Sequence, residues 1–401
     1  MMATNSIGTT PMLGMLGICL SLQLLCFCSA ANPNPPRLPA DVRMNKDAGR
    51  GGVLIVKLHL ESGEAVPVIV DTGCSVTVFD KSMERKLGKR LGSFPGRAGF
   101  GYEFEVGIYA APKLYLGSTP LMMTGTNINT IDLVHWPVLK GCPIKGVLGM
   151  DILENYCVQL DFAANKIRFL DDERADKEYW GKPFPLNDYG GGVSIEGNFL
   201  GTKSPGSFID TGCGEDGWLT PELFRQWTDP TRPPVDGLAR FPDGVLGGET
   251  YSEIDDVDDT EVLSHDALPA NINGIGLHLL SRHLVTLDFP KKTMYLKLTS
   301  IKPLADAKLE AAAKSARELL QSLLKKGQLP GWSKNDEMDA KTAHYFYHFS
   351  NSITCDHLLK RGDSSVYHYE ITRPSMDSPW KLHKAWRTDV TGHMIEEFPS
   401  P

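Results

Sequence analysis

The sequence has no excess of positive charge and, beyond its N-terminal segment, no long apolar run. Its 41 basic and 49 acidic residues give a formal net charge of −8 over 401 residues. A protein that tracks the phosphates of a nucleic acid needs a basic face, so we expect no nucleic-acid partner. A membrane-spanning helix needs about 20 apolar residues, and the absence of such runs downstream excludes a polytopic membrane protein.

The sequence also lacks the motifs of several enzyme classes. It contains no His-Glu-x-x-His zinc motif, no Gly-x-Ser-x-Gly nucleophile elbow and no Walker-type phosphate loop. Gly274-Ile275-Gly276 does not complete a dinucleotide-binding fingerprint, and the eight cysteines show no Cys-x-x-Cys spacing. We therefore expect a protein with no metal and no organic cofactor.

The N-terminal segment has the composition of a targeting signal. Met12–Cys28 is almost wholly apolar and is followed by Ser29–Ala31 and a proline-rich stretch. This pattern predicts a secretory signal peptide over residues 1–31, a linker over residues 32–48, and a secreted or periplasmic protein. No lysine or arginine precedes the apolar run, so an uncleaved N-terminal membrane anchor is the alternative.

Cysteines do not build this protein's scaffold. Three of the eight lie in the predicted leader, and the remaining five are an odd number that cannot all pair with one another. One disulfide, between Cys142 and Cys157 for example, is left open by the sequence.

An internal repeat is the most informative feature. The tetrapeptide Asp-Thr-Gly-Cys occurs at Asp71 and again at Asp210, 139 residues later, and both copies follow a short apolar strand. A short amphipathic segment comes after each copy, at Lys81–Leu87 and Pro221–Trp227. Repeats of this kind indicate architecture more strongly than one short motif indicates function.

Two more blocks recur in the same order. Gly146–Leu153 is echoed by Asn273–Leu280, and Val158–Leu170 is echoed by Val285–Leu298. The last pair has the alternation and turn residues of two strands joined by a tight turn. The repeat therefore predicts two homologous lobes.

Strands dominate both lobes, so the expected fold class is mainly β. A hairpin is predicted at the start of the first lobe, where Val53–Leu60 and Ala65–Val70 flank a turn at residues 61–64. We assign residues 49–178 to the N-terminal lobe and residues 179–300 to the C-terminal lobe.

A further module follows the second lobe, over residues 303–401. Ala305–Lys326 has leucine and alanine on one helical stripe and ends at a glycine, which predicts a helix. Ser365–Arg373 and Trp380–Arg387 have the character of strands. We expect a small α+β module, and its sequence does not indicate a role.

The doubled motif points to a pair of carboxylates. An aspartate at the end of an apolar strand is costly unless it is hydrogen-bonded, and a single copy is best explained as a turn cap. Two related lobes packed about a pseudo-two-fold axis bring Asp71 and Asp210 face to face. Adjacent carboxylates cannot both ionise easily and share a proton, which suits one as base and the other as acid in a hydrolysis.

The segment Val68–Phe79, the block ending at Gly149 and their second-lobe partners resemble the aspartic peptidase family. The local sequence is similar to retropepsins, and the two-lobed length is similar to pepsin. The resemblance covers about residues 50–298 and implies two pepsin-like or retropepsin-like β-barrel lobes with Asp71 and Asp210 as the catalytic dyad. It implies support of the two active-site loops by Thr72, Gly73, Cys74, Thr211, Gly212 and Cys213.

The chain departs from the family pattern at several points. Cys74 and Cys213 stand where the family usually has serine, threonine or alanine, and a thiol is a poorer hydrogen-bond partner than a hydroxyl. His278 replaces the acid found at Asp151, so the second copy of that block looks degenerate. The glycine-rich stretch around Tyr102 is the candidate flap, with an ordinary surface hairpin as the alternative.

Two functions remain open from the sequence. The first is an exported, single-chain aspartic endopeptidase that acts on a peptide or protein substrate, as a monomer with pseudo-two-fold symmetric lobes. The second is a catalytically inactive protein of the same fold that binds a peptide or a glycan. Retention of both aspartates favours the first, because an inactive site is free to lose one.

Overall fold

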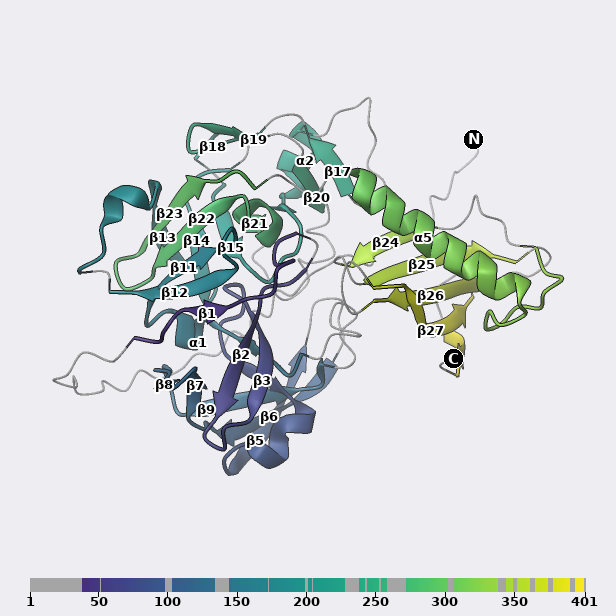
Figure 1. Cartoon of the computed structure of the whole chain (residues 1–401), viewed down its shortest axis with the longest axis horizontal. Coiled ribbons are helices and arrows are strands. Elements are labelled where there is room, and N and C mark those ends of the chain that lie inside the picture. The colour runs from purple at the N-terminus through teal and green to yellow at the C-terminus, as the bar shows by residue number, and fades with distance from the viewer. Residues whose placement is uncertain are drawn as a thin grey trace, which may run out of the picture.

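The fold is described from a computed structural model of the chain (Figure 1). The structure describes residues 38–50, 52–97, 103–133, 144–171, 173–198, 201–203, 205–227, 238–241, 244–251, 254–257, 272–301, 306–337, 344–348, 352–360, 365–373, 378–389 and 394–399. The predicted signal peptide and Cys142 lie outside these residues. Among the described helices, none is both long and apolar enough to cross a membrane.

The first lobe is built on a nine-stranded sheet. The predicted hairpin at its start is confirmed, with β2 and β3 pairing antiparallel around a turn in which Gly63 has a φ of 82°. In sheet order the strands are β5 (Arg90–Arg97), β6 (Glu103–Ala110), β9 (Asn127–Ile131), β4 (Val78–Asp80), β10 (Gly146–Leu148), β3 (Ala65–Val70), β2 (Ile55–Leu60), β7 (Leu114–Leu116) and β8 (Thr119–Pro120).

A twelve-stranded sheet joins the two lobes. Its order is β1 (Val42–Arg43), β12 (Lys166–Leu170), β11 (Cys157–Asp161), β22 (His283–Asp288), β23 (Thr293–Leu298), β13 (Lys182–Tyr189), β14 (Gly192–Ile195), β15 (Ser207–Asp210), β21 (Asn273–Gly276), β16 (Gly217–Trp218), β20 (Ile254–Val257) and β17 (Leu238–Phe241). The lobes meet where β11 pairs antiparallel with β22. β1 lies inside the stretch that the sequence suggested to be a linker, and it pairs with β12.

The helices of the two lobes are short. Within the described residues they are the 3-10 helices η1 (Lys81–Lys86) and η5 (Lys177–Tyr179) and the α-helices α1 (Met150–Leu153), α2 (Pro221–Trp227) and α4 (Leu277–Leu280). The Asp80 side chain caps η1 by accepting from the amide of Ser82 at 3.0 Å. A separate two-stranded hairpin consists of β18 (Gly244–Leu246) and β19 (Glu249–Tyr251).

One apolar core runs through both lobes. It contains Leu58 and Phe79 from the first lobe and Ile209, Leu277 and Val285 from the second, all fully buried. Burial on this scale is the main stabilising contribution to a fold. The mainly β, two-lobed fold class expected from the sequence is thus confirmed.

The C-terminal module is a helix packed on a five-stranded meander. Its strands, in sheet order, are β24 (His344–His348), β25 (Ser352–Leu359), β26 (Val366–Thr372), β27 (Lys381–Thr388) and β28 (Met394–Phe398). Helix α5 (Asp306–Lys325) buries Ala316 and Leu320 against Tyr367, Tyr369 and Ile371 of β26. Figure 1 shows the first-lobe sheet below, the shared sheet above it and this module to the right.

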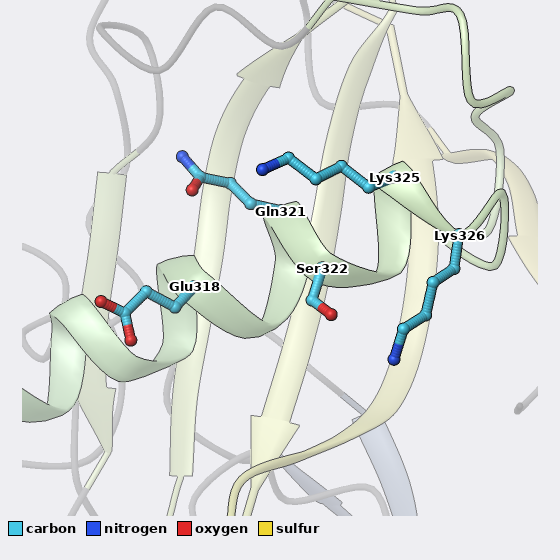
Figure 2. A pocket seen from close by; sticks show the side chains of 5 residues that line it. All are labelled: Glu318, Gln321, Ser322, Lys325 and Lys326. Carbon is cyan, nitrogen blue, oxygen red and sulfur yellow. The ribbon is translucent and has the colours of Figure 1, made fainter.

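A shallow hollow of about 400 Å³ lies along α5 (Figure 2). Its lining residues are Glu318, Gln321, Ser322 and Lys325 of this helix and Lys326, which follows the helix directly. A second hollow, of about 470 Å³, lies on the second lobe between β13, β14 and the residues before β15. Neither hollow includes the two aspartates of the repeat.

Candidate active site

Asp71 and Asp210 lie at equivalent places in the two lobes. Asp71 follows β3 directly, and its amide donates to the carbonyl of Leu148 at the end of β10, 3.0 Å away. Asp210 ends β15, where it pairs with Gly276 at the end of the parallel strand β21. Both side chains are fully or almost fully buried. Each aspartate is therefore held at the end of one strand by the neighbouring parallel strand.

The two threonines interlock the loops across the lobe boundary. The amide of Thr72 donates to Oγ1 of Thr211, and the amide of Thr211 donates to Oγ1 of Thr72, both at 3.0 Å. Each hydroxyl then donates at 2.8 Å to a carbonyl of the other lobe, that of Ile209 or of Val70. These four buried hydrogen bonds fix the separation of the two loops.

The two glycines let each loop approach the other carboxylate. A Cβ on Gly73 would lie 2.7 Å from Cγ of Asp210, and one on Gly212 would lie 2.5 Å from Cγ of Asp71. Real Cβ atoms do not approach other atoms this closely, so larger residues displace the carboxylate. The amides of the same glycines donate at 2.7 Å to Oδ1 of Asp71 and of Asp210, each within its own loop.

The charge on one carboxyl group acts on the pKa of the other, because both groups are buried where the two loops meet. Burial raises the pKa of Asp71 to about 6, although the hydrogen bond from the amide of Gly73 opposes the increase. Burial and the charge of Asp71 raise the pKa of Asp210 well above its ordinary value. The shared proton therefore belongs on Asp210, while Asp71 carries the negative charge above pH 6.

The two cysteines contribute to the loops in different ways: the amide of Cys213 donates to Oδ1 of Asp210 at 3.1 Å, whereas the thiol of Cys74 bonds to a backbone carbonyl. The thiol of Cys74 donates to the carbonyl of Val76 at 3.0 Å. Oδ2 of Asp71 is buried and has no hydrogen-bond partner among the described residues. Burial and the nearby charge of Asp71 raise the pKa of the Cys74 thiol well above its ordinary value, so this thiol stays protonated.

Replacing Cys74 with serine is expected to lower the pKa of Asp71. A hydroxyl is a stronger hydrogen-bond donor than a thiol, and a stronger donor close to the charge of Asp71 stabilises the charged form. In a hydrolysis that uses Asp71 as the base, the charged form is the active one, so the acid limb of the pH–activity profile should move down by about one pH unit in Cys74→Ser. The measurement is kcat/KM from pH 3 to 8 on a cleavable peptide.

Cys355→Ala is the matched control for this prediction. Cys355 is also fully buried, but it lies in β25 of the C-terminal module. The control should leave the acid limb where it is in the unmodified chain. An acid limb that stays in place in Cys74→Ser contradicts the role assigned to the thiol.

Each loop also makes a polar contact with the short helix that follows the neighbouring parallel strand. The residues that make this contact differ between the lobes. In the first lobe, the amide and hydroxyl of Thr77 donate to Oδ1 of Asp151 at 2.8 and 2.6 Å. In the second lobe, Oδ1 of Asp216 lies 3.2 Å from Nδ1 of His278 and accepts from Arg282 at 2.9 Å.

The interpretation of the second block as degenerate is therefore wrong. The acid lost at His278 reappears at Asp216, which lies 139 residues after Thr77, the same offset that separates Asp71 from Asp210. Sequence reasoning missed Asp216 and Arg282. The constant offset of 139 residues could have identified Asp216 as the counterpart of Thr77. The contact of Arg282 with Asp216 could not have been identified in this way, because it depends on the path of the chain after α4.

The structure brings together all of the predicted site residues except one. Tyr102, the candidate flap residue, lies outside the described residues, so the flap stays a prediction. No cluster of metal-ligating side chains is found in the part of the chain that the structure describes.

Comparison with known proteins finds no relative by sequence but finds similarity to solved structures, among them the following two. No family model and no curated protein matches the chain. The aspartic proteinase from Irpex lacteus is similar at a TM-score of 0.42 and 15% identity, covering 65% of this chain and 97% of that one. Basic 7S globulin from soybean is similar at a TM-score of 0.41 and 14% identity, covering 68% and 97%.

Taken on its own strand order and loops, the chain has an aspartic-peptidase-like fold. Two lobes of repeated sequence each supply one Asp-Thr-Gly loop, and the loops meet through reciprocal threonine hydrogen bonds. The expected resemblance is confirmed at the level of the fold.

Proposed function

We propose that the protein is an aspartic endopeptidase whose dyad is Asp71 and Asp210. One observation carries the proposal: two buried carboxyl groups, one from each lobe, are brought together by reciprocal threonine hydrogen bonds, and the pKa of each is raised. Pairs of acids whose surroundings separate their pKa values are typical of general acid–base catalysis. Thr72, Gly73, Cys74, Thr211, Gly212 and Cys213 form the loops that position the pair.

The proposed reaction uses the two groups in different roles. The charged Asp71 accepts a proton from a water molecule, and the resulting oxygen attacks the carbonyl carbon of a peptide bond. Protonated Asp210 donates its proton to the carbonyl oxygen, which gives a neutral tetrahedral diol. Asp71 then gives its proton to the amide nitrogen, Asp210 takes a proton back from one hydroxyl of the diol, and the C–N bond breaks to release a carboxylic acid and an amine, so both groups return to their starting states.

The substrate in this proposal is a peptide or protein segment, and one chain supplies the whole site. Because both aspartates lie in the same chain, a monomer suffices for activity. We also propose that the chain acts after export, on the strength of the N-terminal segment described above.

The test is cleavage of a diverse peptide library by the purified protein between pH 3 and pH 8. We expect cleavage at internal bonds that is blocked by pepstatin, and activity that rises as the pH passes through about 6, where Asp71 loses its proton. A folded protein that cleaves nothing across this range refutes the proposal. If that protein still binds peptides or glycans, the alternative function as a binding protein is supported instead.

A further inference from the structure

We propose that Asp216, His278 and Arg282 are positioning residues that hold the Asp210 loop through a buried network of charged groups. This inference rests on the proposed function, because it assigns these residues to the support of one member of the dyad. It follows from a comparison of the two lobes with each other.

The two lobes carry the same contact with donor and acceptor exchanged. In the first lobe the loop supplies the donor, Thr77, and helix α1 supplies the acceptor, Asp151. In the second lobe the loop supplies the acceptor, Asp216, and helix α4 supplies the donor, His278. The exchange keeps a polar link between loop and helix. Aspartate at position 216 in place of the threonine at 77, and histidine at position 278 in place of the aspartate at 151, therefore compensate for each other.

Arg282 makes the second-lobe contact stronger than its counterpart. One guanidinium nitrogen donates to both Oδ1 and Oδ2 of Asp216, each at 2.9 Å. The side chains of Asp216 and Arg282 are 0% and 5% exposed, so the surrounding solvent screens this pair little. Hydrogen bonds between charged groups are stronger than neutral ones, and removing one partner leaves a buried charge uncompensated.

The network reaches Asp210 through two backbone contacts. The backbone carbonyl of Asp216 accepts from the amide of Gly276 at 2.8 Å, and Gly276 is the β-sheet partner of Asp210. The next amide, that of Leu277, donates at 2.7 Å to the carbonyl of Cys213, three residues after Asp210. Displacement of Asp216 therefore moves both segments that enclose the Asp210 carboxyl.

A merely structural role would lower the melting temperature without altering catalysis in the folded protein. A positioning role predicts a loss in kcat with little change in KM, because the bound substrate is held elsewhere while the acid is misplaced. The two roles are thus separable by steady-state kinetics below the melting temperature.

The decisive experiment transfers the first-lobe pair into the second lobe. Asp216→Thr alone removes the carboxylate that pairs with His278 and Arg282, and His278→Asp alone places a second carboxylate beside Asp216. We expect each to reduce kcat at least tenfold with KM within twofold. The double variant Asp216→Thr/His278→Asp restores a threonine–aspartate pair and keeps a carboxylate close to Arg282, so it should recover most of the lost kcat.

Asp161→Asn is the matched control. Asp161 pairs with Arg168 at 2.8 Å in the β11–β12 hairpin, away from both loops, and its loss should leave kcat within twofold. If kcat of the double variant is reduced by as much as the product of the two single-variant reductions, the two residues act independently and the proposal is overturned. A loss that appears in KM alone overturns it as well.

Hydrogen exchange gives a readout that does not depend on peptidase activity. The amides of Gly212 and Cys213 donate to Oδ1 of Asp210. They should exchange at least tenfold faster in Asp216→Thr and return toward normal in the double variant, while the amide of Gly73 stays unchanged. Unchanged exchange at these amides refutes the positioning role. If the unmodified chain proves inactive but this exchange pattern appears, only the proposed function fails.

Discussion

Asp71→Asn and Asp210→Asn are each expected to reduce kcat/KM for peptide cleavage by about 1,000-fold or more. An amide at position 71 cannot accept the proton of the attacking water. An amide at position 210 cannot donate a proton to the carbonyl oxygen and return to its starting state. Because the two groups act as a unit, the double variant should be little worse than either single variant. The measurement is steady-state cleavage of the best peptide from the library.

Asp188→Asn is the control for both variants. Its carboxylate is 76% exposed and pairs with Lys292 at the surface, so its loss should leave activity within twofold. Both dyad variants should remain folded, since Asp71→Asn removes a charge that burial disfavours and Asp210→Asn replaces a group that is already neutral. Retention of activity within tenfold in both variants would falsify the assignment of the dyad.

The sign of the pH dependence follows from the same groups. The folded-state pKa of Asp71 is raised, so the folded protein binds this proton more tightly than the unfolded chain does. The dyad therefore favours folding in acid, and this contribution is lost as the pH rises through about 6. The proposed peptidase activity should instead rise as the pH increases toward about 6, because the proposed reaction needs Asp71 in its charged form. We expect maximal stability below the pH at which activity is maximal.

Much of the site was predictable because its sequence motif occurs twice in the chain. The two copies of Asp-Thr-Gly identify the strand ends, and the tight packing of loops against each other explains the glycines. The first-lobe hairpin and helix α5 follow from local patterns, because alternation and helical stripes act over a few residues. These predictions needed no knowledge of contacts between distant residues.

The features that sequence reasoning missed depend on distant contacts. The pairing of β11 with β22 joins residues more than a hundred positions apart, and no local pattern indicates it. β1 is only two residues long, and its pairing with β12 gives it a strand conformation. His278 looked like a lost acid when its block was compared alone, because the compensating Asp216 belongs to a different block.

Gly73→Ala and Gly212→Ala are expected to cost about 100-fold in kcat, although each adds one methyl group. Neither glycine has a positive φ, so alanine fits the backbone and the obstacle is space alone. The added Cβ would lie 2.7 Å from Cγ of Asp210 in the first case and 2.5 Å from Cγ of Asp71 in the second. Since the interlocked loops cannot separate easily, the carboxylate itself must move, and small displacements of reacting groups are costly.

Gly92→Ala is the matched control for these two changes. Gly92 lies on β5, also lacks a positive φ, and has no atom within 4 Å of the position a Cβ would take, so activity should be unchanged. The pH profile adds a sharper distinction between the two site variants. Gly212→Ala presses on Asp71, the group that sets the acid limb, whereas Gly73→Ala presses on Asp210, the group that sets the alkaline limb. If both variants keep full activity and an unshifted profile, the loops do not meet as closely as the fold requires, and the dyad cannot share a proton.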